Sequence, residues 1–296
     1  MIPSVAKISV TAFGLSDVGR VRKNNEDNFL FTQLGSGLIN AIPSEPVDSD
    51  CWLFIVADGM GGGQAGEVAS QMTVDLVAKN FTERVSGKQI FDPNLFAKDL
   101  ERAVDQTNQI VFDESQANRE LRGMGTTLTA AAVNGSTITV AQLGDSRAYL
   151  LRDGRIRQLT KDQSLVAQMV AAGKITEAEA KTHPRRNVIL KAVGVQSRVE
   201  VAIANADLKR DDCLVLCSDG LWGKVEPEEI QDYTTRFDPQ AACENLVRLA
   251  NERGGEDNVT VIIAAFSGDG LPLPGTDDAM NSAASKKLRR WWMFWR

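Results

Sequence analysis

Short apolar runs rich in β-branched and aromatic residues recur along most of the chain, a pattern typical of β-strands. Some runs come in pairs around a dipeptide that favours a tight turn, which predicts β-hairpins. The predicted hairpins are 126–133 with 136–143 around Asn134-Gly135, and 149–152 with 155–159 around Asp153-Gly154. Further strands are predicted at residues 8–15, 28–33, 51–57, 199–205, 213–218 and 259–266.

Helical periodicity, in which apolar residues recur every three or four positions, is found in residues 64–84, 95–118 and 239–253. Hairpins with helices grouped between them favour antiparallel sheet covered by helices over a parallel βαβ sheet. The predicted class is therefore α+β. Because strands are predicted near both ends of residues 1–266, we expect these residues to form one domain.

The composition changes after residue 266. Residues 267–285 are rich in Gly, Pro, Ser, Asp and Asn, which predicts a flexible linker. Residues 286–296 form a basic tail that contains three of the chain's five tryptophans. Such a segment suits a membrane surface, where basic groups meet anionic lipid and indoles lie among the headgroups. Docking onto a partner protein and a tail without a selected role are the alternatives.

The formal net charge of −6 is the sum of an acidic body and a basic tail. The tail has five of the 33 basic residues and no acidic one, so residues 1–285 combine 28 basic with 39 acidic residues, a net −11. A body this acidic is a poor electrostatic match for nucleic acid. No apolar run approaches the roughly 18 residues that span a bilayer, and the N-terminus lacks a secretory pattern. We therefore expect a cytoplasmic protein, peripheral at the inner face of the membrane if the tail binds lipid.

The residues available for catalysis are mainly carboxylates. The single histidine, His183, excludes zinc sites built on several histidines. The four cysteines form no CxxC pair, and we expect reduced thiols. A glycine pattern at 61–66 fits a dinucleotide-binding loop, but the neighbouring Asp58 would repel a pyrophosphate, and no strand ending in an acid follows about 20 residues later.

Acidic residues stand where predicted strands begin or end. Asp27 and Asp257 precede strands within Glu-Asp-Asn sequences, whereas Asp58 and Asp219 end strands within Asp-Gly pairs. Antiparallel pairing would bring these ends to the same rim of the fold. Because burying several carboxylates together is costly without cations, and because hard ions prefer oxygen ligands, the pattern predicts a site for Mg²⁺ or Mn²⁺. The glycine after Asp58 and the one after Asp219 let the backbone approach the site closely.

Six segments in order over residues 9–266 resemble the motifs of metal-dependent type 2C serine/threonine protein phosphatases, the PPM family, in its bacterial branch. The segments are 16–28 (SDVGRVRKNNEDN), 56–62 (VADGMGG), 125–127 (GTT), 144–147 (GDSR), 218–222 (SDGLW) and 257–260 (DNVT). The resemblance implies a four-layer α-β-β-α sandwich with two central antiparallel sheets and helices on both outer faces. It also implies a mobile flap at about residues 160–194.

The resemblance further implies a centre with two core Mn²⁺ or Mg²⁺ ions and a possible third. The implied metal ligands are Asp27, Asp58, Gly59 through its carbonyl, Asp145, Asp219 and Asp257. Asp58 would bridge the two core ions, and Asp145 with Asp219 would bind the third. Arg22 would grip the substrate phosphate because a guanidinium offers a planar pair of donors, and Glu26 would orient the attacking water.

Four residues need separate interpretation. Met60 stands where eukaryotic members of the family have histidine, and Gln163 stands where the bacterial branch commonly has histidine. His183 lies in the expected flap, and we interpret it as a structural residue. Arg147 is interpreted as one member of a structural ion pair.

The resulting hypothesis is hydrolysis of phosphoserine and phosphothreonine in proteins by a metal-activated water, in opposition to a cognate serine/threonine kinase. We expect a monomer whose partners are phosphorylated proteins, with no nucleic acid among them. Two alternatives have other functions. A pseudophosphatase that only binds is disfavoured by the intact Asp58, Asp219, Asp257 and Arg22, and a two-metal phosphodiesterase is disfavoured by the acidic body.

Overall fold

The computed structural model describes residues 8–41, 51–61, 64–87 and 92–275, and the strands within these ranges form two antiparallel sheets. The first sheet has the order β1 (Ser9–Asp17), β11 (Val259–Ser267), β10 (Cys213–Cys217), β7 (Arg147–Arg152) and β8 (Arg155–Gln158). The second has the order β2 (Asp27–Gln33), β3 (Cys51–Met60), β5 (Leu128–Asn134), β6 (Thr137–Leu143) and β9 (Ala202–Asp207). The short β4 (Gly125–Thr126) pairs with the end of β3.

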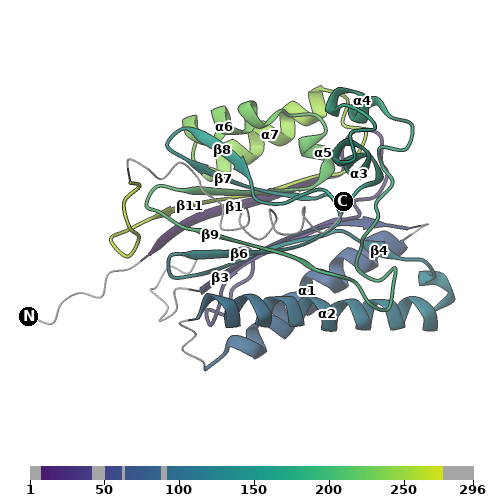
Figure 1. The fold of residues 1–296 in the computed structure, drawn as a ribbon, viewed down its shortest axis with the longest axis horizontal. Coiled ribbons are helices and arrows are strands. Elements are labelled where there is room, and N and C mark those ends of the chain that lie inside the picture. Colours follow the sequence, from purple (N-terminus) through teal and green to yellow (C-terminus); the bar gives the residue numbers. More distant parts are fainter. Residues whose placement is uncertain (1–7, 42–50, 62–63, 88–91, 276–296) are drawn as a thin grey trace, which may run out of the picture.

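Helices cover the outer face of each sheet, so the chain builds the four layers expected from the sequence (Figure 1). The second sheet is covered by α1 (Ala65–Val85) and α2 (Pro93–Ala117), which is followed by the 3₁₀ turn η1 (Arg119–Leu121). The first sheet is covered by α5 (Asp219–Trp222), α6 (Pro227–Arg236) and α7 (Pro239–Glu252). Two short helices, α3 (Leu165–Ala171) and α4 (Glu177–Thr182), lie in the expected flap.

Strand β3 shows why its sequence is apolar almost throughout. Side chains alternate between the two faces of a strand, and both faces of β3 are covered. Leu53 and Ile55 pack against the helices, whereas Phe54 and Val56 pack into the core between the sheets, and all four are fully buried. The same alternation turns Asp58 toward the gap between the sheets, at the end of that strand.

The hairpins form with one shift of register. Arg152 pairs with Arg155, so Asp153-Gly154 is the predicted turn, and both residues have positive φ as a tight hairpin turn requires. In the other hairpin Asn134 itself pairs with Thr137, so the turn residues are Gly135-Ser136 rather than Asn134-Gly135.

The packed body continues beyond the boundary predicted at residue 266. Leu271 is buried against the core between the sheets, and the Pro272 carbonyl accepts a hydrogen bond of 2.9 Å from the Arg210 backbone. The remainder of the predicted linker and the tail at 286–296 lie outside the described residues. Within the described ranges, no helix is both long and apolar enough to cross a bilayer.

Candidate metal centre

Strand pairing places the first two aspartates side by side. Asp27, the first residue of β2, lies directly opposite Asp58 near the end of β3. Opposite residues in an antiparallel pair have Cβ atoms about 5 Å apart, so these carboxylates share one position on the rim. Like charges this close repel each other. The strand register alone therefore creates a site at which a bound cation or added protons would stabilise the two carboxylates.

The other sheet contributes two aspartates to the same rim. Asp219 follows the end of β10, and Asp257 lies two residues before β11. The Ser218 hydroxyl, beside Asp219, donates to Asp27 Oδ2 across the gap at 2.7 Å. The charge of Asp219 also acts on Asp58, whose pKa it helps to raise. The prediction that these four strand ends meet is therefore confirmed by the geometry.

One asparagine holds the loops around the centre together. Asn258 donates through Nδ2 to the carbonyls of Val18 and Asn24, both at 3.0 Å. Its Oδ1 accepts from the Glu26 backbone N–H at 2.8 Å. Neither Asn258 nor Ser218 received a role from the sequence, although both lie inside the quoted motifs. Their function depends on contacts over more than 190 positions, for which the sequence carries no signal of its own.

A fifth aspartate lies in the turn between β6 and β7. Asp145 is 3% exposed, and its Oδ1 atom has no hydrogen-bond partner among the described residues. An unpartnered buried carboxylate oxygen is costly unless a cation or proton satisfies it. This atom, together with an all-oxygen donor set, fits a divalent ion such as Mn²⁺ or Mg²⁺.

The raised pKa values of four of these aspartates also favour a cation or protons at this rim. Burial is the main cause that raises the pKa of Asp27 to about 7, of Asp145 to about 8 and of Asp219 to about 6. Burial, then the charges of Asp27 and Asp219, raise the pKa of Asp58 well above its usual range. Within the described residues, no group of three or more acidic, cysteine or histidine side chains is spaced so that it would hold a metal ion in this conformation.

Two glycines allow the backbone to pack tightly behind the carboxylates. A Cβ on Gly59 would collide with the Gly66 carbonyl and would lie 2.6 Å from the Glu26 carbonyl oxygen. A Cβ on Gly220 would collide with the Asn258 carbonyl. The glycine in each Asp-Gly pair is therefore required by neighbouring backbone, which agrees with the close approach expected from the sequence.

Arg22 and Glu26 both lie at the centre. The Arg22 guanidinium donates to Asp257 Oδ2 at 2.8 Å, and this hydrogen bond is the main cause that raises the arginine pKa. The Glu26 carboxylate packs against Gly66 at the start of α1, and burial raises its pKa. The structure thus brings all the site residues predicted from the sequence to one rim.

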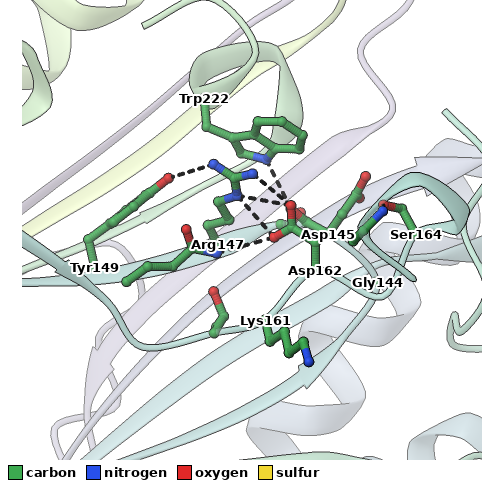
Figure 2. Close-up of polar contacts among 12 residues, drawn as sticks. Gly144, Asp145, Arg147, Tyr149, Lys161, Asp162, Ser164 and Trp222 are labelled. Atoms are coloured by element: carbon green, nitrogen blue, oxygen red, sulfur yellow. Dashed lines mark hydrogen bonds and ion pairs between the residues drawn. The ribbon is translucent and has the colours of Figure 1, made fainter. Parts of the chain in front are cut away.

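Arg147 links the base of the flap to the aspartate cluster (Figure 2). Its guanidinium donates to both carboxylate oxygens of Asp162, the shorter contact being 2.6 Å, and to the Tyr149 hydroxyl at 3.1 Å. The guanidinium carbon lies 3.7 Å from the centre of the Trp222 ring, and the indole N–H donates to the Asp145 carbonyl at 2.9 Å. The structural ion pair predicted for Arg147 is confirmed.

Two further flap residues have structural contacts. The Gln163 side chain accepts from the Gly144 N–H at 3.1 Å, and its amide lies 3.4 Å from the Gln142 carbonyl, so it ties the flap base to the end of β6. His183 ends α4, where its Nδ1 accepts from the Arg185 N–H at 3.1 Å. The structural interpretation of His183 agrees with this local turn.

The chain resembles known proteins over most of its length. The family described as protein phosphatase 2C matches residues 44–253. The chain belongs to the protein phosphatase 2C family. The serine/threonine phosphatase stp of Listeria welshimeri is 36% identical over 249 residues, which cover 84% of this chain and 92% of the relative. The serine/threonine protein phosphatase PstP of Mycobacterium tuberculosis is 36% identical over 290 residues, or 92% of this chain and 51% of that longer protein.

Solved structures of phosphatase 2C relatives confirm the fold. The phosphatase Stp1 of Staphylococcus aureus is 32% identical, with a TM-score of 0.76 over 87% of this chain and 95% of that one. The catalytic domain of PstP in complex with two manganese ions is 32% identical, with a TM-score of 0.72 over 88% of this chain and 100% of that one. The chain is accordingly an enzyme, a metal-dependent serine/threonine protein phosphatase with two antiparallel sheets.

The raised pKa values predict how this phosphatase responds to pH without metal. An aspartate whose folded pKa is raised stabilises the fold below its unfolded pKa, near 4, and loses that contribution as pH rises through the folded value. With divalent ions chelated, the free energy of unfolding should therefore fall by about 2 kcal/mol or more between about pH 5 and pH 8. Urea denaturation measures this fall, which excess Mn²⁺ should largely remove. A chelated protein that is equally stable at both pH values would contradict the prediction, and Asp58→Asn should flatten the slope.

The Arg147 cluster predicts a large loss of stability when its cation is removed. Arg147→Met leaves the Asp162 carboxylate, 12% exposed, without its ion-pair partner, which should cost about 3 kcal/mol or more in urea denaturation. Arg248→Met is the matched control, because Arg248 pairs with Glu252 at an exposed site and should cost less than about 1 kcal/mol. Equal losses in the two variants would show that the buried geometry around Arg147 contributes nothing.

Proposed function

We propose that the five clustered aspartates bind two core divalent ions, Mn²⁺ or Mg²⁺, and a third, and that this centre carries out the phosphatase reaction. The observation that supports this proposal best is the pairing of Asp27 with Asp58, completed by the Ser218 bridge from the other sheet. It gathers carboxylates that are stable together only when cations or protons neutralise them. The two manganese ions of the PstP structure are consistent with the same chemistry.

In this proposal Asp58 and the Gly59 carbonyl would hold the core ions. Asp219 and Asp257 would complete that site from the other sheet, and Asp27 would lie in or beside it. Asp145 and Asp219 would hold the third ion, in agreement with the unpartnered Asp145 Oδ1 atom. Each assignment uses a donor atom whose burial, pairing or position is described above.

The protein's own groups bind and orient the reactants. Bound divalent ions would supply the positive charge that activates a water molecule and stabilises the phosphoryl oxygens. Arg22, which already approaches Asp257 at 2.8 Å, holds two phosphate oxygens through its planar pair of N–H donors. Glu26, with its carboxyl held against the start of α1, accepts a hydrogen bond from the attacking water and orients it toward phosphorus.

The domain organisation is part of the proposal. The catalytic domain comprises residues 1–266 together with the packed segment through Pro272, with the flap at about 160–194, and the residues that follow, up to 285, connect it to the tail at 286–296. The substrates are phosphorylated proteins, and a serine/threonine kinase in the same cytoplasm adds the phosphate that this enzyme removes. The enzyme acts as a monomer. The stp and PstP names support the substrate class.

The residue assignments predict the kinetics of variants. With Mn²⁺ and a phosphothreonine peptide, Asp219→Ala should lower kcat by about 100-fold or more, because one metal ligand is lost. Arg22→Lys keeps the charge but not the bidentate geometry, so kcat/KM should fall by about tenfold or more. Activity of Asp219→Ala close to that of the wild type would refute the assignment. Hydrolysis of a phosphodiester in preference to the peptide would favour the two-metal phosphodiesterase instead.

The tail composition predicts binding to anionic membranes. Residues 286–296 combine five basic residues with three tryptophans and no acidic residue. The full chain should therefore co-sediment with vesicles that contain phosphatidylserine, whereas a chain ending at residue 284 should stay in the supernatant. High salt should weaken the binding, because part of the attraction is electrostatic. Equal partitioning of the two chains would exclude the tail as the membrane anchor.

A further inference from the structure

A second concave site lies beside the aspartate cluster. It is a pocket of about 290 Å³ formed by the loop at residues 189–200 and by Met60. Apolar side chains, among them Leu190 and Val195, provide much of its wall, and Arg198 contributes a cationic group. None of these residues takes part in the chemistry proposed above. We call this site the loop pocket.

The loop of this pocket is separated from the catalytic centre by one short strand, β4. Met60 lies two positions after Asp58 on β3, so the two side chains project from the same face of the strand. Gly59 pairs with Thr126, and Thr126 pairs in turn with Val193 of the loop. Two strand spacings of about 4.8 Å place the loop backbone roughly 10 Å from that of Gly59. A bound phosphoprotein must pass close to this wall.

The loop is built as a rigid element. Asn108 of α2 holds it through three contacts, accepting from the Gly194 N–H at 2.9 Å and donating to the Gln196 and Ser197 carbonyls at 2.9 and 3.4 Å. Val193 exchanges two backbone hydrogen bonds with Thr126, at 2.9 and 3.1 Å. These contacts fix the loop backbone at both sides of its tip, so its shape exists before any ligand arrives.

The rigid loop nevertheless leaves apolar side chains in water. Leu190 is 41% exposed and Val195 is 49% exposed, next to a pocket that their own chain forms. Neighbouring apolar side chains held in the open beside an active site are typical of a surface that binds a partner. Because the loop is already ordered, such a site can bind an apolar side chain of a ligand with little loss of conformational entropy.

The charges around the pocket indicate which kind of residue lies near the apolar side chain in the ligand. Lys191 is neutralised by Glu200 at 2.9 Å. Arg198 is exposed and has no ion-pair partner within the described residues. On a body with a net charge of −11, an unpaired guanidinium beside the centre favours an acidic residue of the ligand.

We infer that the loop pocket receives a large aliphatic or aromatic side chain of the phosphoprotein substrate, within three positions of the phosphorylated residue, while Arg198 pairs with an acidic residue nearby. An extended chain advances about 3.3–3.6 Å per residue, so two or three residues cover the distance from the catalytic centre to the pocket. The inference extends the established phosphatase activity to the choice among substrates, and it does not depend on which residues bind the metals.

A peptide series tests the inference. Phosphothreonine peptides with alanine at the flanking positions are compared with peptides in which one leucine is placed at each position from −3 to +3. The wild type should show a kcat/KM about tenfold higher for leucine at one or two of these positions than for alanine, as expected for an aliphatic group in an apolar pocket. A wild-type enzyme that hydrolyses all the peptides equally would overturn the inference.

Variants of the loop test whether the preference for leucine over alanine arises in the loop pocket. Val195→Asp and the milder Val195→Ala should reduce the leucine-to-alanine ratio toward one. Because the ratio is measured within one variant, a general loss of activity cancels. Leu95→Asp is the matched control, since Leu95 is 56% exposed on α2 and should retain the full ratio. If the leucine-to-alanine ratio fell to one in Leu95→Asp, or stayed at the wild-type value in both Val195 variants, the preference for leucine would not arise in the loop pocket.

Charge reversal tests the acidic partner independently. Peptides that carry the preferred leucine are compared with glutamate or lysine placed at one remaining flanking position at a time. For the wild type, kcat/KM should be higher with glutamate than with lysine at one of these positions. Arg198→Glu should reverse that order. If Arg198→Glu leaves the order unchanged, the acidic residue is recognised by another group, and the role given to Arg198 is wrong.

Discussion

The structure depends on one constraint, the concentration of negative charge where two sheets meet. Five aspartates converge on one rim, and burial is the main cause that raises the pKa of four of them. Their mutual repulsion is tolerable only with protons or cations in the same space. In the proposed centre, divalent ions would balance this charge as well as supply the chemistry.

The rest of the fold supplies the positions that this constraint requires. Antiparallel pairing sets Asp27 beside Asp58, and the Ser218 hydroxyl connects that pair to the opposite sheet. Asn258 ties the loop that carries Arg22 and Glu26 to the start of β11. On the other side, Arg147 and Trp222 connect Asp145 to the flap base. Both sheets therefore have hydrogen-bonded links to the centre, which fits a site that must hold its geometry through turnover.

Local patterns in the sequence were sufficient for most strands, the three long helices and the charged rim. The apolar runs of the strands and the turn dipeptides depend on neighbours only a few positions away, as does the helical period. Helix α6 was missed because it is short and strongly polar, with Ile230 as its only buried residue. The roles of Ser218, Asn258 and Trp222 were missed for another reason, because their partners are distant in sequence and only the folded register brings them together. The loop pocket could not be predicted from the sequence for the same reason, because Met60 and Val195 are brought together only by the pairing of β4 with β3 and with the loop.

The central claim is that the aspartate cluster is a centre for divalent ions, and calorimetric titration of the metal-free protein with Mn²⁺ tests it directly. The account predicts saturable binding of at least two ions near neutral pH. It also predicts a heat that varies with the ionisation enthalpy of the buffer, because aspartates with raised pKa values release protons as ions bind. Asp58→Asn should abolish the core binding. Saturable binding that is unchanged in Asp58→Asn, or no binding in the wild type, would contradict the account.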